Sequence, residues 1–244
     1  PSNTIACKRP CLDTEYYETF NAEHVHLVDI SETGIQSITP TGVSVNDQEF
    51  ELDALVFATG FDAMTGALLG MNITGVDGYT LAEAWADGPR TYLGLSIPEF
   101  PNLFTVTGPG SPSVLTNMIM AIEQHVEWVT DCISFLEENK ISSIEATEDS
   151  MDKWVSHVNE CADVTLMPHA KHTWYYGANI PGKPRVFMPY AGGMARYRAI
   201  CDDIAKQKYI GFKLGETDTG DVWSAPSISV DDLVEAAMVK GPAV

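Results

Sequence analysis

The sequence predicts an α/β fold, because a buried strand and amphipathic helices occur along the same chain. The strand is Ala54–Thr59 (ALVFAT), whose residues are apolar or β-branched and which ends at Gly60. Such a run is typical of a strand buried on both faces of a parallel sheet. After Thr116, apolar residues recur three and four apart, which is typical of a helix. Because open α/β sheets bind ligands where strands end, Thr59 and Gly60 are candidate binding residues, with ordinary packing as the alternative.

Length, charge and cysteine content limit the functions to consider. A chain of 244 residues forms one large or two modest domains. Acidic residues number 34 against 14 basic ones, so nucleic acid is not an expected partner. The 5 cysteines are odd in number and form no CxxC pair, which favours a reducing cytoplasm over a disulfide framework or zinc site. We expect a soluble protein, because no apolar run reaches the roughly 18 residues of a membrane span and no signal peptide is recognisable.

The first part of the chain predicts mainly short strands. Residues 1–21 contain no strand that begins a nucleotide-binding fold, and the chain starts at proline, so we expect it to be the later part of a longer polypeptide. Residues 21–30 alternate in polarity toward a short strand. Residues 35–52 predict a hairpin or meander, with turns at Pro40–Gly42 and Asn46–Asp47.

The middle of the chain changes from strands to helices. A helical turn is predicted over Leu81–Trp85, and a second strand over Asn102–Thr107 (NLFTVT), ending at the turn Gly108–Gly110. A long amphipathic helix follows Thr116 and extends through Leu136.

The last part of the chain is predicted to be mostly helical. A second helix covers Ser150 to about Thr165, a short strand Arg185–Tyr190, and a third helix Ala195 to about Lys206. Near the end, Ser229 and Asp232 resemble a capping box and Gly241 a helix stop.

Three stretches are candidates for chemistry, each with a plainer alternative. Gly108–Asn117 (GPGSPSVLTN) lies between a predicted strand and a predicted helix. Unpaired backbone N–H groups at such a place suit the edge of a flavin or a phosphate. The alternative is a packed turn without a ligand. Lys8–Arg9 is the second candidate, because it is a basic pair in an acidic chain. Its plainer alternative is an ordinary solvated surface pair. Trp174 lies in a loop rich in glycine, proline and aromatics, although most tryptophans belong to the core.

The histidines do not predict a metal site. They lack acidic or cysteine partners at the spacing that metal ligands need. His125 is read as a packing or supporting residue of its helix.

Several blocks of sequence resemble the Baeyer–Villiger monooxygenases, flavoproteins of the phenylacetone and cyclohexanone monooxygenase type. The similarity runs from about Cys7 to Leu214 and includes ATGFDAMTG, GPRTYLGLS, GPGSPSVL, EQHVEW and WYYGANIPGKPR. It implies a Rossmann-like flavoprotein with two dinucleotide-binding domains, of which this chain is the C-terminal portion.

The resemblance also implies a division of the chain. Residues 1–61 would complete an NADPH-binding domain, 62–214 an FAD-binding domain with the substrate pocket, and 215–244 a tail with a short helix. No GxGxxG motif follows a predicted strand, so both phosphate-binding turns would lie in a missing N-terminal half. The chain by itself is then expected to bind neither cofactor well.

By the same resemblance, Arg9 is the active-site arginine and Lys8 lies near the 2′-phosphate of NADPH. A guanidinium stays charged at any working pH and can stabilise an anionic peroxide and the anionic adduct that forms from it. Thr59 and Gly60 belong to the segment that links the two nucleotide domains, and they count among the cofactor-binding residues.

Further residues take roles from the family pattern. Asn117 and Met118 are implied to contact FAD, and Ser113, Val114 and Leu115 to shape the substrate pocket. Trp174 is implied to donate its N–H to bound cofactor from a mobile loop that also carries Asn179 and Lys183. Closure of such a loop would keep water out.

The implied reaction is the NADPH- and O2-dependent insertion of one oxygen atom beside a ketone carbonyl, through a C4a-peroxyflavin, to give an ester or lactone. A flavin monooxygenase that oxidises nitrogen or sulfur is one alternative, and a non-catalytic fragment or interaction module without cofactor is another. The identity of the ketone is left open by the sequence.

Overall fold

The computed structural model describes residues 4–9, 11–215 and 232. The helix end predicted at Gly241 and most of the capping box predicted at Ser229–Asp232 lie outside these residues. The chain divides into a smaller unit, Arg9–Phe61, and a larger unit made of Pro1–Lys8 and Asp62–Val244.

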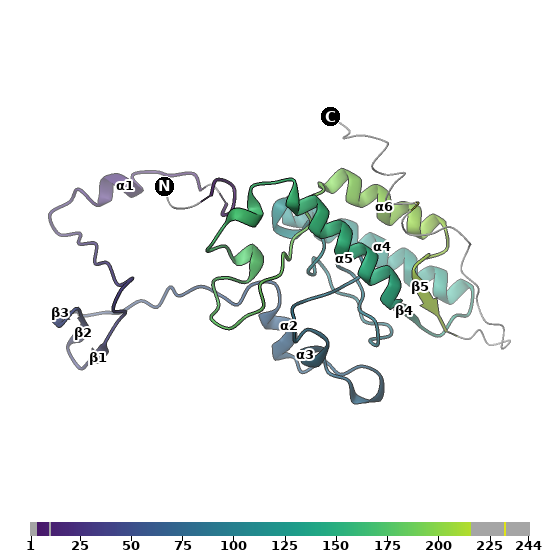
Figure 1. Ribbon diagram of the computed structural model, residues 1–244, viewed down its shortest axis with the longest axis horizontal. Coiled ribbons are helices and arrows are strands. Elements are labelled where there is room, and N and C mark those ends of the chain that lie inside the picture. The colour runs from purple at the N-terminus through teal and green to yellow at the C-terminus, as the bar shows by residue number, and fades with distance from the viewer. Residues whose placement is uncertain (1–3, 10, 216–231, 233–244) are drawn as a thin grey trace. The chain divides into compact units, whose positions relative to one another are not determined.

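The smaller unit contains an antiparallel meander of three strands (Figure 1), β1 (Ser37–Thr39), β2 (Gly42–Val45) and β3 (Gln48–Glu51). Its register pairs Val43 with Ile38 on one side and with Phe50 on the other. Asn46 and Asp47 join β2 to β3 with φ values of 52° and 60°, as the tightest hairpin turns require. The meander predicted over 35–52 is confirmed. A short helix, α1 (Tyr16–Thr19), precedes it.

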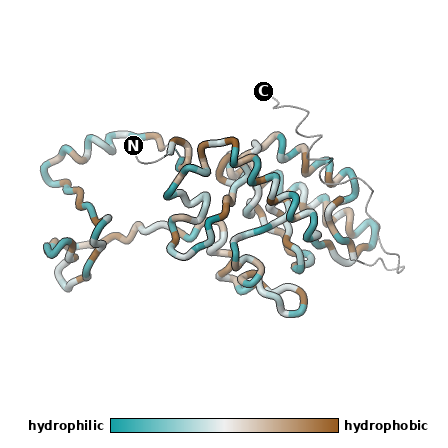
Figure 2. Tube along the Cα trace, in the orientation of Figure 1, coloured by the Kyte–Doolittle hydropathy of each residue, from teal (hydrophilic) through white to brown (hydrophobic). Residues whose placement is uncertain are grey.

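The strands predicted at 21–30 and 54–59 are not formed. Both runs lie outside every β-ladder of the described residues, and the second, apolar in Figure 2, is exposed. Val56 is 84% and Phe57 66% exposed. An apolar run becomes a strand only where a neighbouring strand accepts its hydrogen bonds, and the described residues supply none here. The predicted parallel sheet is therefore absent from the described part of the chain, whose sheets are antiparallel.

The larger unit is mainly helical. In chain order its elements are α2 (Gly66–Gly70), η1 (Val76–Gly78), α3 (Leu81–Ala84), η2 (Ser113–Leu115), α4 (Met118–Glu138), β4 (Ile144–Ala146), α5 (Glu148–Asp163), η3 (Met167–His169), η4 (Trp174–Tyr176), α6 (Met194–Lys206) and β5 (Phe212–Leu214). The helical turn predicted over Leu81–Trp85 is confirmed as α3, and the three predicted helices are confirmed as α4, α5 and α6. The antiparallel pair β4–β5 was not predicted.

Large aromatic side chains join α4, α5 and α6, whose ribbons are labelled in Figure 1, in one core. Trp128 of α4 donates its indole N–H to the Cys201 carbonyl of α6 over 2.9 Å. Trp154 of α5 is fully buried and stacks on Tyr190, with ring centroids 5.3 Å apart. Each indole thus fixes the helix that carries it against a partner from another part of the chain.

The strands predicted at Asn102–Thr107 and Arg185–Tyr190 are irregular segments instead. Their backbone groups pair singly with loops: the Thr105 N–H donates to the Leu95 carbonyl over 2.8 Å, and the Tyr190 N–H to the Ser111 carbonyl over 2.7 Å. Isolated pairs of this kind fix a loop without forming a ladder.

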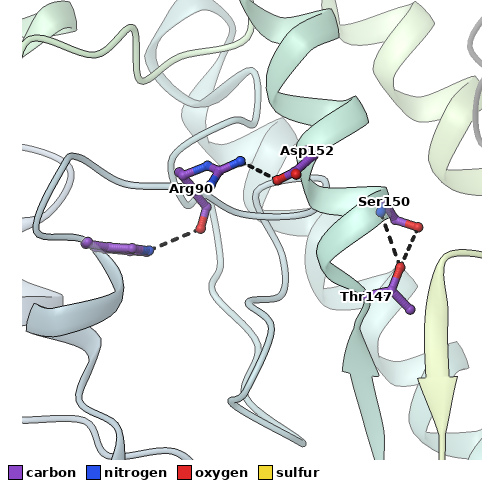
Figure 3. Close-up of polar contacts among 5 residues, drawn as sticks. Arg90, Thr147, Ser150 and Asp152 are labelled. Carbon is purple, nitrogen blue, oxygen red and sulfur yellow. Dashed lines mark hydrogen bonds and ion pairs between the residues drawn. The ribbon is translucent and has the colours of Figure 1, made fainter.

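The Gly88–Ser96 segment is braced against α5 (Figure 3). The Arg90 guanidinium forms an ion pair with Asp152 of this helix. The Arg90 carbonyl accepts the indole N–H of Trp85 over 3.1 Å. At the start of α5, the Thr147 hydroxyl accepts the Ser150 N–H over 3.2 Å and lies 3.2 Å from the Gly211 carbonyl next to β5.

Among the described residues, no helix combines the length and the apolar character needed to cross a bilayer.

Thr147 links the start of α5 to the segment before β5, so its removal tests this part of the core. We expect Thr147→Ala to lower the free energy of unfolding by about 1 to 2 kcal/mol, because a helix N–H loses its acceptor. Urea unfolding measures the change. Thr147→Ser keeps the hydroxyl and serves as the control; an equal loss in both variants would contradict a role for the cap.

Candidate functional site

The Gly108–Leu115 segment is fixed by hydrogen bonds from several directions. The Gly110 N–H donates to the Met188 carbonyl over 2.6 Å. The Gly110 carbonyl accepts the indole N–H of Trp154 over 3.1 Å, and the Pro109 carbonyl accepts the Thr91 hydroxyl over 2.5 Å. These partners come from segments far apart in the sequence, so the turn is held rigidly in the larger unit.

Close approach and unusual backbone angles mark this segment. Gly110 has a φ of 89°, and a Cβ there would lie 2.9 Å from the Thr91 hydroxyl and 3.3 Å from the Trp154 indole nitrogen. Thr107 and Ser113 also have positive φ, 54° and 36°. Such angles are rare for residues other than glycine and persist where the surroundings enforce them, which is common at functional sites.

A chain of hydrogen bonds through His125 of α4 supports the start of the segment. The Thr107 N–H donates to His125 Nδ1 over 2.8 Å, and Nε2 lies 2.8 Å from the Tyr197 hydroxyl of α6. That hydroxyl donates to the Leu93 carbonyl over 2.7 Å. Nδ1 accepts a hydrogen bond and therefore carries no hydrogen. The Tyr197 hydroxyl gives its hydrogen to Leu93, so Nε2 must carry a hydrogen and donate it to the Tyr197 oxygen. The imidazole thus has one N–H and is neutral.

Burial explains why the pKa of His125 is low. Desolvation lowers the pKa of His125 from 6.5 to about 4. Its side chain is inaccessible to solvent, and both ring nitrogens already have partners. His125 therefore connects α4, α6 and two loops. Sequence reasoning assigned it a packing or supporting role, and only these contacts reveal which backbone groups it holds.

The start of α4 has one polar cap and an apolar surface. Asn117 accepts the N–H groups of Ile119 and Met120 with its side-chain oxygen, over 3.0 and 3.3 Å. Ile119 is 64% and Met120 50% exposed, and Met118 is half-buried. Asn117 thus fixes the first turn of α4 beside exposed apolar side chains.

The loop that contains Trp174 is ordered by Thr173. Its hydroxyl accepts the Tyr175 N–H over 3.2 Å and donates to the Cys7 carbonyl over 2.6 Å. Trp174 is half-buried and meets Tyr175 edge-on, with ring centroids 4.6 Å apart. The Met188 N–H donates to the Tyr175 carbonyl over 2.9 Å. Because Met188 also pairs with Gly110, the loop and the Gly108–Leu115 segment share one support.

Lys183 and Ser113 both contact the segment that follows Asp62. The Lys183 ammonium pairs with the Asp62 carboxylate and donates to the Ala63 carbonyl over 3.1 Å. The Ser113 hydroxyl lies 4.0 Å from the Met64 sulfur. The larger unit thus brings together three stretches that the sequence singled out: the residues after Asp62, Gly108–Leu115 and the Trp174 loop.

Other predicted site residues are more exposed. Arg9, Thr59 and Gly60 belong to the smaller unit, and all three are exposed. The Arg9 carbonyl accepts the Cys11 thiol at 3.7 Å. Lys8 and Asn179, in the larger unit, are exposed as well. Ser113 is fully buried, whereas Val114 and Leu115 are half-buried.

Within the described part of the chain, no group of three or more His, Cys, Asp or Glu residues is arranged to hold a metal ion.

The crowding around Gly110 leads to a test of the turn. Gly110→Ala should lower the free energy of unfolding by about 1 to 3 kcal/mol, because the new methyl group meets Thr91 and Trp154 at a positive φ. The control is Gly182→Ala, since Gly182 also has a positive φ, 79°, but a Cβ there would have nothing within 4 Å. Chemical unfolding of both variants compares them; equal losses would mean that only the backbone angle matters.

The neutral state of His125 predicts a pH dependence. Between pH 6.5 and about 4 the unfolded chain protonates this histidine and the folded chain does not, so this contribution to stability is complete above pH 6.5 and is lost as the pH falls. The loss approaches about 1.4 kcal/mol per pH unit in that window.

Urea unfolding of the wild type and of His125→Asn, at pH 7 and pH 5, measures this effect. The asparagine amide can bond to the same partners without titrating, so the variant should lose less stability on acidification. Parallel losses in the two proteins would contradict a buried neutral histidine.

Known proteins resemble this chain in sequence along most of its length. No family model matches it. A cyclohexanone 1,2-monooxygenase from Acinetobacter sp. is 40% identical over 211 residues, which cover 86% of this chain and 38% of that enzyme. A Baeyer–Villiger monooxygenase from Pseudooceanicola batsensis is 40% identical over 206 residues, 84% of this chain and 37% of the relative. A phenazine N-monooxygenase from Lysobacter antibioticus is 40% identical over 211 residues, 86% of this chain and 38% of the relative.

Solved structures show the same relationship in three dimensions. An oxidised steroid monooxygenase bound to NADP matches with a TM-score of 0.79 and 46% identity, over 88% of this chain and 40% of that one. The enzyme OTEMO in complex with FAD and NADP matches with a TM-score of 0.82 and 37% identity, over 88% of this chain and 39% of that one.

The chain thus spans about two fifths of the length of the relatives it matches. The resemblance predicted from the sequence blocks is confirmed: this chain is similar to Baeyer–Villiger monooxygenases in both sequence and fold, and it aligns with about two fifths of their length.

Proposed function

We propose that this chain is the C-terminal part of an FAD- and NADPH-dependent monooxygenase that inserts one atom of O2 beside a ketone carbonyl to give an ester or lactone. The supporting observation is its similarity to Baeyer–Villiger enzymes over more than four fifths of its length. Because the chain covers only two fifths of those enzymes, the proposal includes an N-terminal half of the same polypeptide that supplies the phosphate-binding turns.

The larger unit has features that fit a flavin. At the start of α4, exposed apolar side chains at Ile119 and Met120 adjoin the polar Asn117, and a flavin ring likewise combines apolar faces with a polar edge. The oxygen of Asn117 is occupied by the helix cap, so its contact to FAD would come from the amide N–H groups. Met118, the first residue of the helix, is the second proposed FAD contact.

Arg9 is the proposed catalytic residue. FAD, when bound, supplies the activation of O2 with electrons from NADPH. The contribution of this chain is a guanidinium that remains charged and offers several N–H donors, which favours negative charge on the oxidant and on the oxygen of the attacked carbonyl. The exposure of Arg9 leaves it accessible to a ligand.

Contacts to NADPH are proposed for several other residues. Lys8 is an exposed cation next to Arg9 and suits the 2′-phosphate. Thr59 and Gly60 are exposed residues of the smaller unit. Trp174, Asn179 and Lys183 share one loop, in which the Lys183 ammonium is engaged by Asp62 and Ala63. A direct contact of Lys183 to cofactor therefore requires this pairing to open.

The proposed substrate pocket is shaped by Ser113, Val114 and Leu115. Ser113 is fully buried, so Val114 and Leu115 are the two whose side chains retain accessible surface. The rigid support of the Gly108–Leu115 segment would keep these side chains in fixed positions relative to a ketone. Their size would then select among ketones.

The proposed domain roles follow the division of the chain that the resemblance to Baeyer–Villiger monooxygenases implies. Residues 1–61 are assigned to an NADPH-binding domain, 62–214 to an FAD-binding domain, and 215–244 to a tail.

We also propose a cytoplasmic location, because all five cysteines, Cys7, Cys11, Cys132, Cys161 and Cys201, are free thiols.

A second candidate function is oxidation at nitrogen. It is favoured by the relative named as a phenazine N-monooxygenase, which is as similar to this chain as the ketone-oxidising relatives. The two reactions differ in product, an N-oxide or an ester, so one experiment separates them. A non-catalytic module is the third reading, and it predicts a colourless full-length protein that consumes no NADPH.

The role of Arg9 is tested in the full-length protein with NADPH and a panel of ketones. We expect Arg9→Ala to reduce ester formation by roughly 10²-fold or more while FAD stays bound, since a donor to a developing anion is lost. Arg9→Lys keeps the charge without the planar array of donors and should restore only part of the rate.

The matched control is Arg198→Ala. Arg198 is exposed on α6 and pairs with Glu127 of α4, and neither residue belongs to the proposed site. Mass spectrometry identifies the product. Equal activity in wild type and Arg9→Ala would remove Arg9 from the mechanism, and N-oxide without ester would support the second candidate.

A further inference from the structure

The chain leaves the larger unit after Lys8 and re-enters it at Asp62. One loop, Thr173–Lys183, contacts both of these points from within the larger unit. At one end Thr173 bonds to Cys7, and at the other Lys183 pairs with Asp62. We name the two crossing segments, residues 4–8 and 62–65, the exit and re-entry segments.

The contact at the exit segment is buried. Thr173 is fully inaccessible and Cys7 is 3% exposed. The Thr173 hydroxyl uses its hydrogen on the Cys7 carbonyl and accepts the Tyr175 N–H, while the Cys7 thiol points to the Leu166 carbonyl at 3.9 Å. A buried hydrogen bond is difficult to open, because its groups would otherwise lack partners. Cys7 therefore anchors the residues that lead directly to Lys8 and Arg9.

The contact at the re-entry segment is a partly buried ion pair. The Lys183 side chain is 10% exposed and Asp62 is 42% exposed. Lys183 also donates to the Ala63 carbonyl, so two consecutive residues are held. Its alkyl stem packs on Gly177, where a Cβ would lie 3.1 Å from Lys183 Cδ. The loop thus folds back on itself to present the ammonium to Asp62.

The loop between these two contacts is internally connected. The Ala178 N–H donates to the Thr173 carbonyl over 3.2 Å, and the Lys183 N–H to the Ile180 carbonyl over 3.3 Å. The stretch from Trp174 to Asn179, which carries the proposed cofactor contacts, lies between Thr173 and Lys183.

We infer that Thr173 and Lys183 are positioning residues through which the loop holds both the exit and the re-entry segments. We call this arrangement the clasp. Release of either end of the loop should loosen the loop and both segments together. The consequence for Lys8, Arg9 and Trp174 as cofactor contacts rests on the proposed function. The clasp itself does not, because it is measured on the protein without turnover.

Hydrogen exchange of the full-length protein tests the clasp. Thr173→Val removes the hydroxyl but keeps the branched side chain, and Lys183→Met keeps the stem but removes the charge. We expect each variant to accelerate exchange by roughly fivefold or more in peptides covering residues 4–9, 62–66 and 173–183, as the loss of a net hydrogen bond implies. The decisive measurement is the exchange rate of the segment far from each substitution. This is the peptide of residues 4–9 in Lys183→Met, and the peptide of residues 62–66 in Thr173→Val.

Matched controls separate the clasp from general destabilisation. Thr130→Val removes a hydroxyl that bonds only within α4, and Lys206→Met removes a lysine paired with Asp203 in α6. Both should leave the three peptides unchanged. Thr173→Ser keeps the hydroxyl and should restore slow exchange. Acceleration confined to the contact next to each substitution would overturn the inference, as would unchanged exchange in both variants.

A kinetic measurement then separates this inference from the proposed function. If the full-length protein oxidises ketones, Thr173→Val should raise the KM for NADPH more than it lowers kcat, because Thr173 acts on the position of the binding residues and is not itself a proposed cofactor contact. A protein with the exchange behaviour above but no ketone oxidation would keep the clasp and reject the proposed function.

Discussion

The hydrogen-bond chain through His125 is the interaction on which the larger unit most depends. It joins the backbone of Thr107 to α4, α4 to Tyr197 of α6, and Tyr197 to the backbone of Leu93. Every donor in this chain has one acceptor, so each group is satisfied only while the others stay in place. A neutral imidazole is required, and burial provides it by holding the pKa of His125 at about 4.

The candidate site is built on this support. Thr107 immediately precedes the Gly108–Leu115 segment, whose glycine at position 110 allows Thr91 and Trp154 to approach the backbone. Met188 connects that segment to Tyr175, and Thr173 connects the same loop to Cys7. Irregular backbone can be rigid when its polar groups are paired in this way, as the proposed contacts to a cofactor and a ketone would require.

Sequence reasoning succeeded where local information decides the structure. The long helices follow from apolar spacing, and the meander from the turn at Asn46–Asp47, because both signals lie within a few residues. It failed at residues 54–59, since a strand also requires a partner strand. Within the site, Gly108–Asn117 was singled out by its place between a predicted strand and a predicted helix, and the roles of this segment and of Trp174 came from resemblance to a family. The pairs Thr173–Cys7 and Lys183–Asp62 are separated by 166 and 121 residues, and only the folded chain shows them.

The most direct test of the proposed oxygen insertion follows the oxygen atoms. The full-length protein is incubated with NADPH, a cyclic ketone and ¹⁸O2, and the product is analysed by mass spectrometry. The proposed function predicts a lactone that carries one labelled oxygen for each NADPH consumed, with the second labelled atom in water. A lactone without label, or NADPH oxidation that yields only hydrogen peroxide with every ketone tried, would contradict it.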